Sequence, residues 1–226
     1  TNDYLLENSK KNKISICLTE SQTKGRGRNS KAWQSPKYEN IYMSISFSTN
    51  QDLKFFSSFS LVTALSVQKA LTKHKFDTKI KWPNDIYINS KKVGGILIET
   101  LSKDKNNIVV VGIGLNVFMK SNLKIDREWT SLILENESMS IDRNKIISDI
   151  ANELLIDKKT FEEKGFGAFR KNFNELNILK NKKVSLSNSQ YDDVVALDVN
   201  EDGSLNLKTK GEISKIFSGE VSIRLN

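Results

Sequence analysis

The placement of glycine restricts the fold of this chain more than any other feature of the sequence. The 226 residues contain eleven glycines, and six of them fall in three short tracts: Gly25 and Gly27, Gly94 and Gly95, and Gly112 and Gly114. Glycine is needed where the backbone takes unusual angles or where another group approaches it closely. Three such tracts in a glycine-poor chain predict a ligand cradle, and three tight turns are the simpler alternative.

Composition excludes several classes of protein. A hydrophobic fraction of 38% can form a core, so the 27% charged residues indicate a solvated surface and not a disordered chain. The sequence has no apolar run long enough to span a membrane, and residues 1–10 lack the pattern of a secretory signal. One cysteine, Cys17, and one histidine, His74, exclude an internal disulfide and a Cys/His zinc cluster. We therefore expect a cytoplasmic protein.

The net charge predicts an affinity for anions. Lys plus Arg number 35 and Asp plus Glu number 27, which gives 35 − 27 = +8. Nucleic acid, nucleotide phosphates, carboxylate substrates and acidic protein partners all fit this charge. The choice among them depends on local motifs.

Hydrophobic periodicity predicts an α+β fold. A short helix is expected from the N-terminus to Glu7, and longer helices at 55–71 and 143–173, the last interrupted near Gly165. Strands are expected at 14–18, 40–47, 79–82, 86–88, 93–101 and 107–117. The polar stretch 19–37 is a long basic loop. Five further strand candidates, at 184–186, 193–199, 204–209, 213–217 and 221–225, predict a small β-barrel or β-sandwich after a boundary near residue 180.

The first glycine tract lies in the basic loop. If residues 25–28 are extended, Arg26 and Arg28 share one side, and the glycine N–H groups can close on a phosphate or carboxylate. Lys31 adds a third positive charge. A solvated basic loop is the alternative. RNA contact by a disordered segment is not favoured, because residues 33–36 return directly to an ordered strand.

The second tract follows a bend at Lys-Trp-Pro-Asn-Asp. Pro83 keeps the preceding residue out of helical angles and presents Asn84 and Asp85 at a fixed bend. Asp85 is a candidate ligand for magnesium, and an Asx-turn is the alternative.

Lys92 precedes the glycine pair of this tract on an otherwise apolar strand, where a cation needs an anionic partner. That partner is either a ligand carboxylate or an internal one, Glu99 or Glu20.

The third tract, Gly-Ile-Gly-Leu-Asn, is not a dinucleotide-binding fingerprint. Its third glycine is absent and no helix is expected after it. Gly112 and Gly114 instead allow a flat ligand to lie against a buried strand. Asn116 then bonds the ligand or only terminates the strand.

Together the motifs closely resemble those of biotin protein ligases. They are Gly-Arg-Gly-Arg with Trp33-x-Ser-Pro36, Lys-Trp-Pro-Asn-Asp with Lys-Lys-x-Gly-Gly-Ile-Leu-Ile-Glu, and Gly-Ile-Gly-Leu-Asn. Thr1-Asn2 resembles the start of the family's catalytic domain, and residues 219–224 resemble the end of its C-terminal domain. The resemblance implies a mixed sheet with helices, related to class II aminoacyl-tRNA synthetases, over residues 1–179. It implies an SH3-like barrel over 180–226.

The resemblance also implies an activity. Biotin protein ligases activate biotin with ATP and Mg²⁺ to biotinyl-5′-AMP and transfer biotin to one lysine of a carrier domain, the biotin carboxyl carrier protein of acetyl-CoA carboxylase. Homodimers occur in the family, and DNA-bound repression requires an upstream winged-helix domain. The residue expected before Thr1 is missing, which indicates a fragment or an ordered portion of a longer protein.

The resemblance assigns residues to roles. Contact with biotin is implied for Thr1, Asn2, Gln22, Gly25, Arg26, Gly27, Arg28, Lys92, Gly94, Gly95, Leu97, Gly112 and Gly114. Contact with ATP is implied for Arg28, Lys31, Asn84, Asp85, Asn116 and Trp129, and Asp85 is also the candidate metal ligand. The catalytic candidates are Arg26, Arg28 and Lys92. Joining two anions needs alignment and positive charge and no covalent nucleophile. The family often carries further arginine or glycine where this chain has Asn29-Ser30-Lys31, so the resemblance is weakest at Lys31.

Two alternatives differ in substrate or in class. Lipoate and octanoate ligases share the architecture by resemblance, but their Arg-Arg-x-x-Gly-Gly-Gly-x-Val signature is absent. A basic nucleic-acid-binding module would show salt-sensitive binding that ignores biotin. It would leave the second and third glycine tracts without a purpose.

Overall fold

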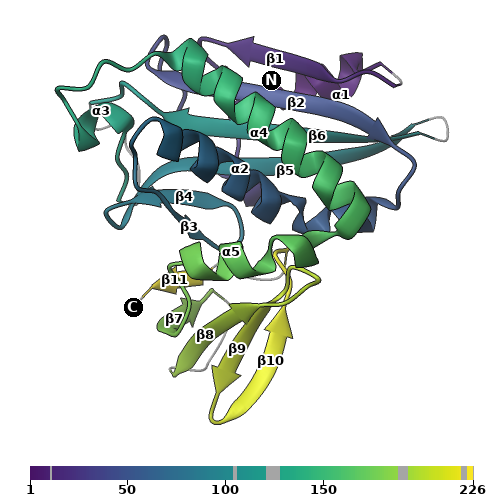
Figure 1. Ribbon diagram of the computed structural model, residues 1–226, viewed down its shortest axis with the longest axis vertical. Helices are drawn as coiled ribbons and strands as arrows, with labels where there is room; N and C mark the ends of the chain where they lie inside the picture. Colours follow the sequence, from purple (N-terminus) through teal and green to yellow (C-terminus); the bar gives the residue numbers. More distant parts are fainter. Residues whose placement is uncertain (11, 104–105, 121–127, 188–192, 220–222, 226) are drawn as a thin grey trace.

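A six-stranded antiparallel sheet forms the centre of the molecule (Figure 1). The computed structural model describes residues 1–10, 12–103, 106–120, 128–187, 193–219 and 223–225. Along the sheet the strands follow the order β1-β2-β6-β5-β4-β3. Their bounds are β1 Ser15–Thr19, β2 Asn40–Thr49, β3 Lys79–Lys81, β4 Asp85–Ile88, β5 Lys91–Lys103 and β6 Asn106–Asn116.

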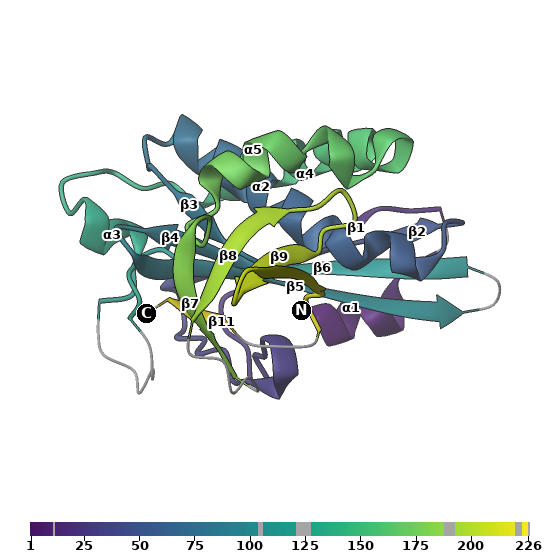
Figure 2. The ribbon, with the colours of Figure 1, turned by 90° about the horizontal axis from the view of Figure 1, so that it is seen from below.

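Two long helices cover one face of this sheet, and a short helix lies on the other (Figure 2). The long helices are α2, Phe59–Lys73, and α4, Arg143–Lys164. The short helix is α1, Asn2–Asn8. Asp142 caps α4, because its side chain accepts hydrogen bonds from the first backbone amides of the helix. The remaining helices are α3, Leu132–Glu135, and α5, Arg170–Leu176, with 3₁₀ turns at Arg28–Ser30, Leu53–Ser58 and Phe166–Ala168.

The main core lies between the sheet and the long helices. Val109, Val111, Ile113 and Leu115 alternate along β6 and are all buried on this side. On the opposite side of the same strand, Ile108 and Val110 pack against α1, and the next two positions on that side are glycines. Alternation along a strand sends successive side chains to opposite faces, so one strand builds the core and the glycine face together.

A second sheet ends the described chain. It has the order β10-β9-β8-β7-β11, with β7 Lys182–Leu186, β8 Val194–Val199, β9 Leu205–Thr209, β10 Glu212–Ile216 and β11 Ile223–Leu225. The turn between β8 and β9 docks on the main sheet, since the indole of Trp82 donates a hydrogen bond of 3.0 Å to the carbonyl of Gly203. Gly203 has a φ of +83°, which favours glycine there.

The α+β class, the helix and strand positions in the main region and the short strands after residue 180 confirm the sequence expectations. The expected mixed sheet needs correction, because every pairing between the described strands is antiparallel, and parallel contacts occur only as isolated bridges. Tight turns, such as Asn89 and Ser90 at positive φ between β4 and β5, require antiparallel neighbours. Helix α3 was not expected. Residues 221–222 of the last expected strand lie outside the described residues.

None of the helices in the described ranges is long and apolar enough to cross a membrane.

Candidate active site

Gly95 of β5 and Gly112 and Gly114 of β6 form a floor on the face of the sheet that the long helices leave open, whereas a methyl group at Gly94 would point to the core side, toward Leu115 and Ile86. Gly95 pairs with Gly114 across the two strands, and Leu97 pairs with Gly112. A methyl group at Gly114 would lie 2.7 Å from the indole of Trp33, and one at Gly112 would overlap the amide of Asn2. The glycines are therefore needed for close approach, as the sequence predicted. Here the groups that approach are the protein's own side chains.

Trp33 reaches the floor from a small hairpin within the basic loop. The amide of Trp33 donates to the carbonyl of Gly25 at 2.9 Å, and the amide of Gly27 donates to the carbonyl of Lys31 at 2.8 Å. Asn29 turns the hairpin with a φ of +53°. The loop is thus ordered by its own backbone bonds, which its sequence, lacking any apolar period, did not predict.

Lys92 lies beside Trp33 and forms an ion pair with Asp85. The ammonium of Lys92 donates a hydrogen bond to the Asp85 carboxylate, and these side chains are only 12% and 14% exposed. The ammonium also lies 5.3 Å from the centre of the Trp33 ring, within range of a cation–π interaction. Asp85 is therefore an internal partner of Lys92, in place of the two expected from the sequence, Glu99 and Glu20.

Arg28 sits near the tip of the hairpin and is half-buried. Burial lowers the pKa of its guanidinium, and the nearby charge of Asp85 opposes this shift. Within the described ranges, the Arg28 guanidinium has no hydrogen bond or ion pair. A half-buried cation without a partner favours an anionic ligand.

A cavity of about 240 Å³ opens beside Arg28, at the edge of β5. Arg28, Asn84 and Leu97, three of the residues assigned by resemblance, contribute to its wall, together with Phe56 and Ser60. Its wall combines polar groups with apolar side chains.

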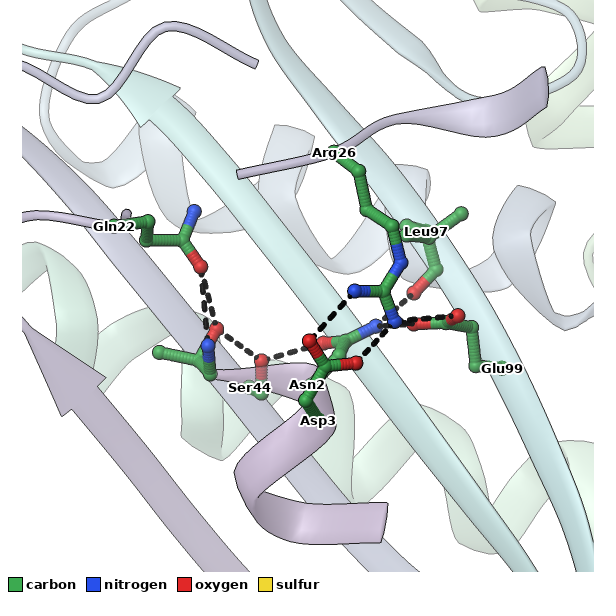
Figure 3. A network of polar contacts seen from close by, with 8 residues as sticks. Asn2, Asp3, Gln22, Arg26, Ser44, Leu97 and Glu99 are labelled. Atoms are coloured by element: carbon green, nitrogen blue, oxygen red, sulfur yellow. Dashed lines mark hydrogen bonds and ion pairs between the residues drawn. The ribbon is translucent and has the colours of Figure 1, made fainter. Parts of the chain in front are cut away.

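A polar network occupies the other end of the floor (Figure 3). The Ser44 hydroxyl lies 2.6 Å from both Thr1 Oγ1 and Asn2 Oδ1. The Thr1 hydroxyl donates to Gln22 Oε1 at 3.2 Å, and the Asn2 amide donates to Glu99 Oε2 at 2.7 Å. The structure thus brings together Thr1, Asn2 and Gln22, which the sequence assigned to biotin.

Arg26 belongs to the same network but is held by carboxylates (Figure 3). Its guanidinium donates to Asp3 Oδ2 at 2.8 Å and to both carboxylate oxygens of Glu99, at 2.9 and 3.0 Å. These contacts raise the pKa of Arg26, and the Arg26 hydrogen bond lowers the pKa of Asp3. Direct contact of Arg26 with a ligand stays a prediction, since these donors already have partners.

The two asparagines assigned to ATP hold backbone instead. The side chain of Asn84 donates to the carbonyl of Ile96 at 2.7 Å, and the side chain of Asn116 donates to the carbonyl of Thr130 at 3.0 Å. Asn84 therefore shapes the cavity wall, and Asn116 fixes the segment at Thr130. Their contact with ATP stays a prediction.

The segment that Asn116 fixes runs beside Lys92. Trp129 forms an isolated backbone bridge with Lys92, and the amide of Thr130 donates to the Lys92 carbonyl at 2.8 Å. This places Trp129, half-buried, near the floor. Lys31 is exposed, and its carbonyl closes the hairpin described above.

The described residues contain no preformed cluster of metal ligands, and Asp85 as a magnesium ligand stays a prediction. In the described part of the chain, His, Cys, Asp and Glu nowhere gather in a group of three that could hold a metal ion. The carboxylate of Asp85, the candidate from the sequence, accepts from Lys92. A bound magnesium ion usually needs one or two carboxylates besides water and substrate phosphates.

Motif reasoning assigned no place at the floor to four residues, namely Asp3, Trp33, Ser44 and Glu99, although Trp33 and Glu99 lie within the quoted motifs. A signal existed for Ser44, because the apolar alternation of 40–47 turns it away from the core. Trp33 stood inside the first motif. The partners of Asp3 and Glu99 become apparent only once the chain is folded.

Comparison with known proteins places this chain in a family. The profile of the "Biotin/lipoate A/B protein ligase family" matches residues 1–116. The chain belongs to this family. It is 29% identical to the bifunctional ligase/repressor BirA of Escherichia coli (strain K12), an alignment that spans 99% of the chain and 71% of that protein.

Two further relatives agree with this placement. The biotin--[acetyl-CoA-carboxylase] ligase of Mycobacterium tuberculosis is 28% identical over 91% of the chain and 77% of its own length. The structure of the biotin protein ligase from Aquifex aeolicus in complex with biotin and ATP matches with a TM-score of 0.84 and 30% identity. It covers 100% of this chain and 95% of that one. The resemblance stated from the motifs is confirmed.

Proposed function

We propose that this family member is a biotin protein ligase, which activates biotin with ATP to biotinyl-5′-AMP and then transfers biotin to a carrier lysine. One observation supports this most directly: two cations, Arg28 and Lys92, lie beside a glycine floor. The guanidinium of Arg28 has no hydrogen bond or ion pair in the described structure. The Aquifex relative, which binds biotin and ATP, shares this fold along the whole chain. The proposal therefore rests on the site and on the relatives together.

The first step needs positive charge and alignment. A carboxylate oxygen of biotin attacks the α-phosphorus of ATP, a new oxygen–phosphorus bond forms, and the bond to pyrophosphate breaks. Arg28 and Lys92 would offset the repulsion between the two anions and stabilise the charge of the transition state. Holding both reactants in line supplies much of the remaining acceleration. In the second step the carrier amine attacks the acyl carbon, and AMP leaves.

The floor and the polar network would hold biotin. Thr1, Asn2 and Gln22 offer donors and acceptors of the kind that the ureido group of biotin requires. A ligand lying on Gly114 would occupy the volume that the Trp33 indole now fills, since a methyl group there already overlaps the ring. We therefore expect Trp33 to move when biotin binds.

The finer assignments are part of the proposal. Residues 1–179 would form the catalytic domain, with a sheet related to class II aminoacyl-tRNA synthetases, and residues 180–226 an SH3-like domain. Two antiparallel sheets, one on each side of this boundary, support the division. Magnesium would arrive bound to the phosphates of ATP, and Asp85 stays the candidate carboxylate to contact it.

The partners are inferred from the relatives. The name of the Mycobacterium tuberculosis relative points to the carrier domain of acetyl-CoA carboxylase as the acceptor. A cytoplasmic location agrees with the single cysteine. A homodimer, and DNA binding through an upstream domain, stay predictions.

Pyrophosphate exchange into ATP tests the proposal. The protein is incubated with Mg²⁺, ATP and labelled pyrophosphate, and biotin, lipoate and octanoate are compared as the acid. We expect exchange with biotin alone. Exchange with lipoate or octanoate would show that the floor binds one of these acids in place of biotin. Absence of exchange with all three acids would favour a nucleic-acid-binding module.

A further inference from the structure

Glu135, at the end of α3, joins the turn between β4 and β5 to the segment that carries Trp129. The side chain of Asn89, which lies in that turn and 46 residues earlier in the chain, donates to Glu135 Oε2 at 2.6 Å. The hydroxyl of the buried Thr130 donates to Glu135 Oε1 at 2.5 Å. Each carboxylate oxygen thus accepts a hydrogen bond from a different segment, and the Glu135 side chain bridges the two.

Lys92 is connected to both segments that Glu135 joins. It follows Asn89 closely in the chain, at the start of β5. Its backbone is also bonded to the second segment: the Lys92 amide donates to the carbonyl of Glu128 at 3.2 Å, and the Thr130 amide donates to the Lys92 carbonyl at 2.8 Å. The bridge through Glu135 therefore closes a ring of contacts that includes the backbone of Lys92, whose ammonium belongs to the site.

The side chain of Trp129 is available for a planar ligand. Its backbone is fixed by the isolated bridge to Lys92, but its ring is only half-buried. Among the described residues, this ring has no hydrogen bond and no aromatic or cation–π contact. An accessible aromatic face binds a flat heterocycle by stacking. The contacts that fix the backbone of Trp129 therefore determine where its ring meets such a ligand.

We propose that Glu135 is a positioning residue for the nucleotide, which holds the ring of Trp129 at the adenine of ATP in a fixed position relative to Lys92. The inference rests on the proposed function, which assigns Trp129 to ATP and Lys92 to the reacting anions. Because one carboxylate holds both segments, its loss misplaces the ring that binds the base while the charges of the site remain. Small misplacements of a positioning group have large effects on a bound reactant.

The test separates the hydrogen bonds of Glu135 from its charge. Glu135→Ala removes the bridge. Glu135→Gln removes the charge but keeps an oxygen that accepts from Thr130 and an amide that donates to the Asn89 side-chain oxygen once that side chain turns over. Glu137→Ala is the matched control, because the Glu137 side chain is 70% exposed and its ion pair with Lys120 is long, at 3.9 Å. The full chain is used for every variant.

We expect Glu135→Ala to raise the KM for ATP in biotin-dependent exchange about fivefold, which is about 1 kcal/mol, the net value of one hydrogen bond. The KM for biotin should not change, because Lys92 keeps its place in β5 and its ion pair with Asp85. Glu135→Gln should recover most of the affinity for ATP, and Glu137→Ala should behave as the unaltered protein. A merely structural defect would reduce the active fraction without a selective change in the KM for ATP.

Quenching of tryptophan fluorescence by acrylamide, without any ligand, separates failure of the inference from failure of the proposed function. The emission of Trp129 is obtained as the difference between each protein and the same protein with Trp129→Phe. We expect stronger quenching of Trp129 in Glu135→Ala than in Glu137→Ala. If the unaltered protein shows no exchange with biotin, the proposed function fails, and this difference in quenching still supports positioning by Glu135. Equal quenching in the two variants, or an equal KM for ATP, would overturn the inference.

Discussion

The two faces of the central sheet are built from the same strands but by different rules. Toward α2 and α4, the side chains of β2 and β6 are large, apolar and buried. Toward α1 and the basic loop, β2 presents Tyr42, Ser44 and Ser46, and β6 ends in Gly112 and Gly114. The first face needs only a hydrophobic pattern. The second depends on individual hydrogen bonds and ion pairs, such as those of Ser44 and Lys92.

This contrast separates stability from function. On the helix face, burial and packing carry the free energy of folding, and a substitution is expected to act on stability. On the floor face, hydrogen bonds and ion pairs position a few groups, and a substitution is expected to act on the chemistry. Each prediction below tests that separation.

The largest effect is expected on the helix face. Phe161 of α4 is fully buried. The centre of its ring lies 4.6 Å from the ring centre of Phe55 and 5.0 Å from that of Phe59. We expect Phe161→Ala to lower the free energy of unfolding by about 3–5 kcal/mol, because a cavity replaces the ring. Urea denaturation measures this loss. The KM for biotin of the fraction that remains folded should not change, and a raised KM would contradict the separation.

The second effect compares the two cations of the floor face. We expect Lys92→Ala and Arg28→Ala each to lower kcat/KM for adenylate formation at least about tenfold, which is about 1.4 kcal/mol. Only Lys92→Ala should also destabilise the fold, because it leaves the buried carboxylate of Asp85 without its ion-pair partner.

The control for the Lys92–Asp85 ion pair is the double variant Lys92→Met/Asp85→Asn. It removes both charges, so it should recover stability but not activity. Exchange kinetics and urea denaturation report the two properties separately. Unaltered exchange in both single variants, at limiting biotin, would refute the roles given to these cations.

The same contrast explains what the sequence could predict. The alternation of Ile41, Met43 and Ile45 identified a strand and its buried face, because the period of a strand is local information. The motifs identified the floor through the family resemblance. The partner of Lys92 could not be predicted, because it depends on how β4 and β5 pair, and their register shifts between Ile86 and Tyr87.

The ion pairs of Arg26 were hidden for a related reason. Asp3 and Glu99 are 23 and 73 residues from Arg26, and no periodic pattern connects such positions. The hairpin that carries Arg26 has no apolar period either, since backbone hydrogen bonds and a residue at positive φ shape it. Such contacts follow from the assembled sheet and not from local sequence preference.

A third prediction adds one methyl group to the floor. Gly114→Ala should displace the Trp33 indole, because the new atom would lie 2.7 Å from the ring. We expect the KM for biotin to rise about tenfold, which is about 1.4 kcal/mol, because the methyl group projects from the floor into the volume proposed for biotin. The matched control is Gly219→Ala, where the added methyl group meets nothing within 4 Å. A change in tryptophan fluorescence in Gly114→Ala alone would report the displaced ring, and equal KM values in the two variants would contradict the prediction.

The smallest effect tests whether every polar residue of the floor face serves the chemistry. The phenol of Tyr42 is buried, donates to the carbonyl of Pro36 at 3.0 Å, at the end of the basic loop, and accepts from the side-chain amide of Asn40 at 3.1 Å. We expect Tyr42→Phe to lower the free energy of unfolding by about 1 kcal/mol, the usual net value of the bond to Pro36, without changing the KM for biotin. The Asn40 amide keeps its contact with Met119 Sδ at 3.7 Å.

The pH dependence of Tyr42 provides an independent check on this structural role. Burial raises its pKa to about 12, so folding favours the neutral phenol. This contribution to stability is complete below the unfolded pKa, near 10, and is lost as the pH rises through about 12. The phenolate absorbance that is lost in Tyr42→Phe, relative to the unaltered protein, should therefore develop as the pH approaches about 12. A difference that develops near pH 10 would place Tyr42 in solvent and remove the reason for the stability loss.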